Sequence, residues 1–81
     1  MTTFQIEAFI TLTTTLNYTK ASNLLHTTQP NLSKLIISME QELEAKLIDR
    51  NRRGVSLTPA GMAFLKDATK IMKLYDAAVT N

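Results

Sequence analysis

The residues with the most distinctive chemistry lie close together, in a short stretch that begins at position 29. Gln29, Ser33 and Lys34 have polar or cationic side chains at helical spacing, so a helix here would present them to solvent together. Gln can pair bidentately with adenine, Lys can reach guanine or a phosphate, and Ser can reach several base edges. Pro30 and Ile37 could contact a thymine methyl group. This combination suits the reading of DNA bases.

Charge favours the same interpretation. No carboxylate occurs on this stretch before Glu40, so phosphates could approach it without repulsion. A second basic group, Arg52-Arg53, precedes Gly54 in a polar turn, where arginines can lie along phosphates or enter the minor groove. Both groups also have a purely structural interpretation, because Gln, Ser and Lys are common on exposed helices and a basic turn can simply be solvated.

The composition offers little for catalysis. The chain has 81 residues with one His, no Cys and a net charge of +2, and it has neither a Gly-rich phosphate loop nor paired carboxylates. We therefore expect no enzyme, no catalytic residue, no cofactor and no metal site, and we expect His26 at a helix end or core edge. No apolar run approaches the ~20 residues of a membrane span. The expected location is the cytoplasm, in association with the bacterial nucleoid.

Apolar periodicity and capping residues predict the elements that would position these groups. Thr2 with Gln5 fits a capping box, Asn17 or Thr19 could cap a second helix, and Pro30 suits a first helical turn. The expected helices are 3–15, 19–26, 29–45 and 59–80, with a small hairpin within 47–57. We expect the second helix to bury Ala21, Leu24 and Leu25, and the third to bury Leu32, Leu35, Ile36, Met39 and Leu43, with Leu47 extending that stripe.

The second and third helices are separated by a break of about three residues, the spacing of a helix-turn-helix. In that motif the second helix enters the major groove, and the hairpin at 48–57 would lie beside it as a wing. The expected fold class is mainly α, a winged helix-turn-helix of three helices plus a small β-hairpin wing. It would occupy residues 1–58 and be followed by a long linker helix in 59–81.

The last helix has an apolar stripe longer than a small three-helix core could cover. Such a stripe favours pairing with a second copy, as homodimers are the commonest oligomers. Alternatively, its first half packs against helix 3–15 of the same chain. The residues of the predicted dimerisation stripe are Phe64, Leu65, Ala68, Ile71, Met72, Tyr75 and Val79.

At this level of detail the sequence resembles LysR-type transcriptional regulators. The segments NYTKAS at 17–22, LLH at 24–26 and QPNLSK at 29–34 are similar to the signature SFTxAAxxLxxxQPxLSxxI. The segments at 39–50 and 57–61 are similar to LExxLGxxLFxR and LTxAG. The resemblance covers nearly the whole chain and keeps its spacing throughout.

The resemblance implies a sequence-specific DNA-binding domain that binds interrupted A/T-rich dyads in double-stranded DNA. Its linker helix would form a homodimer, usually antiparallel, and a tetramer of a full-length protein is left open. A co-inducer-binding domain normally follows, outside these 81 residues. Base reading falls on Gln29, Pro30, Ser33 and Lys34, wing contacts on Arg52 and Arg53, and phosphate or capping roles on Thr19 and Thr28. The full set of expected DNA-binding residues adds Asn31 and Ile37.

The chain departs from the family pattern at several positions. Glu44 replaces a Gly, Ile48 replaces a Phe, and Ser22 replaces an Ala at a tight helix contact, where its hydroxyl could bond a backbone carbonyl. Leu35, Ile37 and Ser38 stand where polar or basic residues are frequent, which bears on the number of phosphate contacts. The alternatives are a winged-helix module that binds proteins, and a winged-helix regulator of another family.

Overall fold

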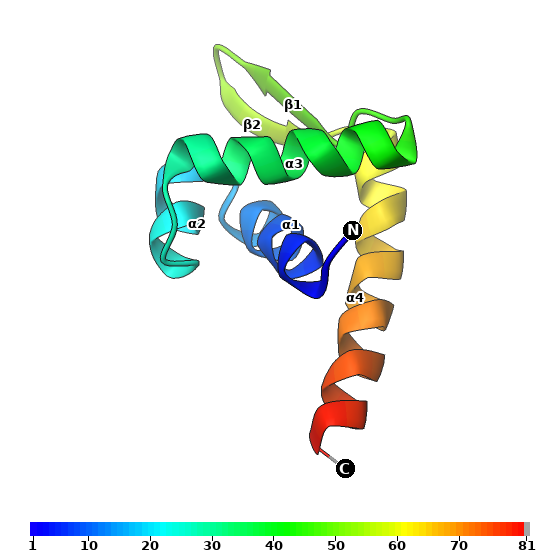
Figure 1. Cartoon of the computed structure of the whole chain (residues 1–81). Coiled ribbons are helices and arrows are strands. Elements are labelled where there is room, and N and C mark those ends of the chain that lie inside the picture. The colour runs from blue at the N-terminus through cyan, green and yellow to red at the C-terminus, as the bar shows by residue number, and fades with distance from the viewer. Residues whose placement is uncertain (81) are drawn as a thin grey trace.

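Four helices and one antiparallel hairpin make up residues 1–80, which are the residues that the computed structural model describes. Helix α3 lies across α1, α2 packs beside both, and α4 runs away from them toward the C-terminus (Figure 1). The predicted winged helix-turn-helix is therefore confirmed. The elements are α1 (Thr3–Thr15), α2 (Tyr18–Leu24), α3 (Gln29–Leu43), β1 (Ile48–Asn51), β2 (Gly54–Leu57) and α4 (Pro59–Thr80).

The helices begin where short polar side chains satisfy their first backbone N–H groups. The capping box of α1 is formed: the N–H of Gln5 donates to Thr2 Oγ1 over 3.1 Å, and the N–H of Thr2 donates to Gln5 Oε1 over 2.8 Å. Asn17 caps α2, since its Oδ1 accepts from the N–H of Lys20 at 2.9 Å. The helix consequently starts at Tyr18, one residue before the predicted start.

Helix α2 ends at Leu24, two residues before its predicted end. His26 adopts a left-handed backbone with φ of 55°, and the N–H of Thr27 donates to the carbonyl of Ser22 over 2.9 Å. This bond across the helix end is that of a Schellman motif. The early end leaves Leu24 64% exposed, so its predicted burial is wrong, whereas His26 does lie at a helix end as expected.

Helix α3 ends in the same way, at Leu43 instead of the predicted residue 45. Glu44 is left-handed with φ of 51°, and the N–H of Ala45 donates to the carbonyl of Glu40 over 3.1 Å. The chain therefore makes this turn with a side chain in the left-handed conformation, at a position where the LysR-type pattern that the sequence resembles has Gly. Leu43 is 37% exposed, so it is not part of the buried stripe.

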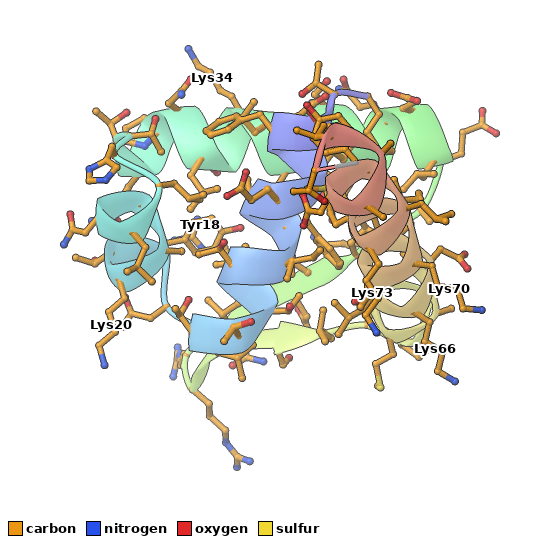
Figure 2. All side chains as sticks on the ribbon, turned by 90° about the horizontal axis from the view of Figure 1, so that it is seen from below. Tyr18, Lys20, Lys34, Lys66, Lys70 and Lys73 are labelled. Atoms are coloured by element: carbon orange, nitrogen blue, oxygen red, sulfur yellow. The ribbon has the colours of Figure 1, made fainter. Side chains whose placement is uncertain are left out.

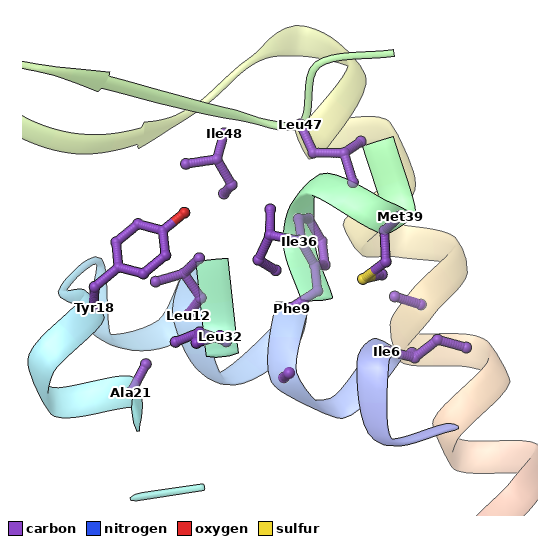
Figure 3. Close-up of a cluster of buried hydrophobic side chains, with 12 residues drawn as sticks. Ile6, Phe9, Leu12, Tyr18, Ala21, Leu32, Ile36, Met39, Leu47 and Ile48 are labelled. Carbon is purple, nitrogen blue, oxygen red and sulfur yellow. The ribbon is translucent and has the colours of Figure 1, made fainter. Parts of the chain in front are cut away.

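The core lies between α1, α2, α3, the start of the hairpin and the first half of α4 (Figure 3). The rings of Phe9 and Phe64 are 5.2 Å apart and tilted by 59°. Ser22, at the tight contact of α2, is buried and its hydroxyl donates to the carbonyl of Thr19 over 3.0 Å, as predicted. The buried apolar residues are Ile6, Ala8, Phe9, Leu12, Tyr18, Ala21, Leu32, Ile36, Met39, Leu47, Ile48 and Ala68.

The wing and α4 are joined by a close backbone contact. The N–H of Thr58 donates to the carbonyl of Leu47 over 3.1 Å, and Thr58 Oγ1 accepts from the N–H of Gly61 at 3.0 Å and donates to the carbonyl of Lys46. A Cβ on Gly61 would lie 2.2 Å from the Leu47 oxygen, so only glycine fits there. Thr58 therefore caps the start of α4 and also fixes α4 to the base of the hairpin.

The left-handed Glu44 generates a stability prediction. We expect Glu44→Gly to raise the free energy of unfolding by about 0.5–1 kcal/mol, because glycine adopts this conformation without a Cβ clash. The matched control is Gln41→Gly, an exposed position inside α3, which should lower it by about 1 kcal/mol. Urea unfolding measures both, and a loss of stability in Glu44→Gly would contradict the interpretation.

Candidate nucleic-acid interface

The outward side of α3 has the composition expected for a DNA-reading surface. Gln29, Pro30, Lys34 and Ile37 are exposed and Ser33 is half-buried. The first turn of α3 contains no acidic residue. A duplex could approach this side without meeting a carboxylate in its first turns.

Glu40 has the first carboxylate along α3, and this carboxylate is hydrogen-bonded to the protein backbone. Its Oε2 accepts from the N–H of Leu47 at 2.7 Å and from the N–H of Ile48 at 3.3 Å. These bonds hold the start of β1 against the last turn of α3. The charge of Glu40 is thereby used to position the wing.

The side chain of Gln29 is oriented by the helix before it. Its Nε2 donates to Thr19 Oγ1 over 3.0 Å, which ties α3 to α2 across the turn of the motif. The second amide hydrogen and the carbonyl oxygen of the Gln29 side chain remain available to bind a ligand. Thr19 thus supports Gln29, and the predicted helix cap at Thr19 is wrong because Asn17 fills that place.

Of the other residues predicted to contact DNA near the start of α3, Thr28 and Asn31 form hydrogen bonds within the protein, whereas Lys34 extends outward. Thr28 is the N-cap, with Oγ1 accepting from the N–H of Asn31 at 3.2 Å. Asn31 is exposed, and its Nδ2 donates to Thr27 Oγ1 over 2.7 Å, so its amide is bound to the turn. Lys34 points away from the body of the protein (Figure 2).

Two residues that the sequence analysis did not place at the interface line it. Tyr18 and Arg50 form one hollow with Gln29, Pro30 and Ser33, between the start of α3 and strand β1. Tyr18 belongs to the core and Arg50 to the wing, and nothing in the local sequence connects them. The signal that could have indicated this pair is an aromatic residue at the start of α2 combined with an arginine on the wing strand.

Arg50 contacts an aromatic ring and makes no ion pair with Asp49 or with a carboxylate of α3. Its guanidinium carbon lies 4.1 Å from the centre of the Tyr18 ring, a cation–π contact, and no ion pair of Arg50 occurs within residues 1–80. Burial raises the pKa of Tyr18 above its ordinary value, and the positive charge of Arg50 partly opposes this. The phenol is therefore neutral at physiological pH.

The wing presents its arginines at the tip of the hairpin. The register pairs Ile48 with Leu57 and Asn51 with Gly54, which leaves Arg52 and Arg53 as the two turn residues. The N–H of Arg53 donates to Asn51 Oδ1 over 2.9 Å, and Gly54 has a φ of 119°. Both arginines are exposed.

The apolar stripe of α4 divides into two parts. Phe64, Leu65 and Met72 pack against the core of their own chain, and Ala68 is fully buried there. Ala68 therefore has no surface to offer a partner, because α1 covers it, and the alternative of packing within the chain is correct for this part.

The second part of the stripe remains exposed. Ile71 is 41%, Tyr75 45% and Val79 65% exposed. Leu74, which the sequence analysis did not include, is 73% exposed and falls between them. A hollow between α1 and α4 adjoins this surface, with Phe4 and Ile10 on one wall and Tyr75 on the other.

Comparison with known proteins assigns the family. The family model of bacterial regulatory helix-turn-helix proteins, lysR family, matches residues 4–62. The chain belongs to the lysR family. No helix within residues 1–80 is long and apolar enough to cross a membrane, and no cluster of three potential metal-binding side chains occurs in that part of the chain.

Relatives and solved structures agree with this assignment. The chain is 42% identical over 71 residues to the transcriptional regulator BudR of Klebsiella aerogenes, covering 88% of this chain and 50% of that protein. An HTH-type regulator of Azotobacter vinelandii is 41% identical, with 88% and 49% covered. The chain thus spans about half the length of these relatives. The CbnR_DBD–DNA complex superposes with a TM-score of 0.93 at 34% identity, covering 99% of this chain and 92% of that one.

Proposed function

We propose that this chain binds double-stranded DNA sequence-specifically as a homodimer, and that it is the DNA-reading part of a LysR-type transcriptional regulator. The observation that carries the proposal is the exposed side of the first turns of α3, which contains no carboxylate, beside an arginine-tipped wing. The CbnR_DBD–DNA complex, a close structural neighbour, supports it. Association with the nucleoid follows from DNA binding.

Base reading belongs to Gln29, Pro30, Ser33 and Ile37 in this proposal, with α3 in the major groove. Gln29 is the best-prepared of them, because Thr19 holds its amide and leaves a donor and an acceptor for adenine. Pro30 and Ile37 present apolar surface suited to thymine methyl groups. These chemistries together favour A/T-containing half-sites.

Positioning on the duplex belongs to the residues that carry charge at the edges of this surface. Arg52 and Arg53 at the wing tip would contact phosphates or the minor groove, and Lys34 a phosphate or guanine on the other side of α3. Thr28 and Asn31 lie at the start of α3, where a phosphate would be favoured by the helix end.

Dimerisation belongs to the second half of α4. Ile71, Leu74, Tyr75 and Val79 form an apolar surface on a helix that extends beyond its own core, and a second α4 would cover it. A symmetric dimer of reading heads requires a two-fold symmetric operator, which is the interrupted dyad. The protein-binding alternative does not account for an acid-free side of α3 next to exposed arginines.

Selection from a pool of random duplexes tests the proposed function. We expect enrichment of an A/T-rich sequence with two-fold symmetry. Gln29→Ala should cost about 1–3 kcal/mol on the selected site and nothing on random DNA, because base contacts carry the preference. The matched control is Gln41→Ala, far along the same helix, which should leave the preference intact. Absence of any enriched motif would favour the protein-binding alternative.

The wing contact has a separate test in the salt dependence of binding. Replacing Arg52 and Arg53 together with Ala should reduce the slope of log K against log salt by roughly one to two units, on selected and random duplexes alike. Fluorescence anisotropy titrations at several salt concentrations measure the slope. An unchanged slope would show that the wing does not touch the backbone.

The dimer interface is tested by sedimentation. Ile71→Glu should convert dimers to monomers, because it buries a carboxylate in an apolar contact between helices. Lys73→Glu is the matched control, because two positions along α4 from Ile71 correspond to about 200° around the helix, so the charge changes on a different side. Dimers that persist in Ile71→Glu would place the interface elsewhere.

A further inference from the structure

The stacked pair of Tyr18 and Arg50 has a geometry that a core contact does not require. Tyr18 is 7% exposed and its ring belongs to the core, whereas Arg50 is exposed and lies over the ring face at 4.1 Å. A cation held over an aromatic face is attracted by the electrons of the ring, and this attraction does not require its N–H donors to bond an acceptor. The ring therefore fixes the cation without using its hydrogen bonds.

Two hollows between α3 and the wing share Tyr18, Ser33 and Arg50 in their linings, and we call them together the channel. Towards the start of α3 it adjoins Gln29, Pro30 and Ser33, and further along it is lined by Ile37, Glu40 and Lys46. The Glu40 carboxylate accepts from two backbone N–H groups. Two cations thus flank a channel whose only carboxylate is bonded to the protein itself.

We propose that Arg50 binds a backbone phosphate of DNA in this channel, and that Tyr18 is the positioning residue that holds its guanidinium ready for it. The inference rests on the proposed function for the identity of the polyanion. A phosphate here would lie beside the bases read by Gln29 and Ser33, so the contact would set the depth of α3 in the groove. Arginine suits this role because its planar fork matches phosphate oxygens.

The alternative is that Arg50 only shields the ring and stabilises the fold. The two roles differ in what happens when both residues are changed. If Tyr18 acts on DNA through Arg50, its replacement should affect binding only while Arg50 is present. A purely structural ring would weaken binding equally with or without Arg50.

The experiment measures the affinity of the 81-residue chain for the selected and a random duplex at several salt concentrations. Arg50→Gln should lower the slope of log K against log salt by about 0.9 for each bound copy on both duplexes, the value for one phosphate, and hence by about 1.8 for the proposed dimer. Tyr18→Phe keeps the ring and should bind as the unchanged chain does. Tyr18→Leu should weaken binding by about two- to fivefold, the range of an exposed cation–π contact, and should have no effect in the Arg50→Gln background.

Two results would overturn the proposal: an unchanged salt slope in Arg50→Gln, or an equal loss from Tyr18→Leu in both backgrounds. If circular dichroism shows Tyr18→Leu unfolded, Arg50→Lys serves instead, with the slope retained and the affinity reduced severalfold, since a compact ammonium loses the planar fork. Full affinity in that variant would also contradict the proposal. Failure of the proposed function would be distinguishable, because the chain without substitutions would then show no preference between the selected and the random duplex. The salt slopes measured on random DNA would still test the role of Arg50.

Discussion

The carbonyl oxygen of Leu47 is the point on which the arrangement of the wing and α4 depends. It lies 2.2 Å from the position that a Cβ of residue 61 would take, and it also accepts from the N–H of Thr58. Because the first turn of α4 is pressed against the residue that begins the hairpin, neither element can turn without the other. The helix then passes over α1 through Phe64 and leaves its C-terminal half beyond the core. This backbone contact thus fixes the wing on one side of the core and directs the C-terminal half of α4 to another. The first surface suits DNA and the second suits another copy of the chain.

The starts of the helices and the order of the elements could be predicted because they depend on local chemistry. Thr2 with Gln5, Thr28 before Pro30 and Thr58 before Pro59 each specify a helix start within a few residues. The ends were predicted less well, because His26 and Glu44 are not glycines and their left-handed backbones follow from how the next element must pack. Because α2 ends early, Leu24 is exposed, although its hydrophobic side chain had indicated burial.

The candidate site shows the same division between local and distant information. The face of α3 follows from helical spacing, so Gln29, Ser33 and Ile37 could be placed from the sequence. The stacking of Arg50 on Tyr18 could not, because the two residues are distant in the chain and meet only when α2 and the hairpin pack on α3. Ala68 and Leu74 were misjudged for a related reason, since periodicity describes one stripe and not which part of it the chain itself covers.

A net charge of +2 is small for a protein that binds a polyanion, yet it suffices if the negative charges are kept from the contact surface. Glu40 is bonded to the backbone of the wing, and Glu42 lies 2.8 Å from the N-terminal ammonium group. The cations nearest the reading surface are few, so each copy can neutralise only a handful of phosphates and would bind weakly alone. In the proposed homodimer, joining two copies through α4 would make the second contact effectively intramolecular, which would raise affinity without further charge. The modest charge of the DNA-binding surface and the exposed apolar half of α4 are thus complementary features, because pairing of the helices would supply the affinity that the few cations do not.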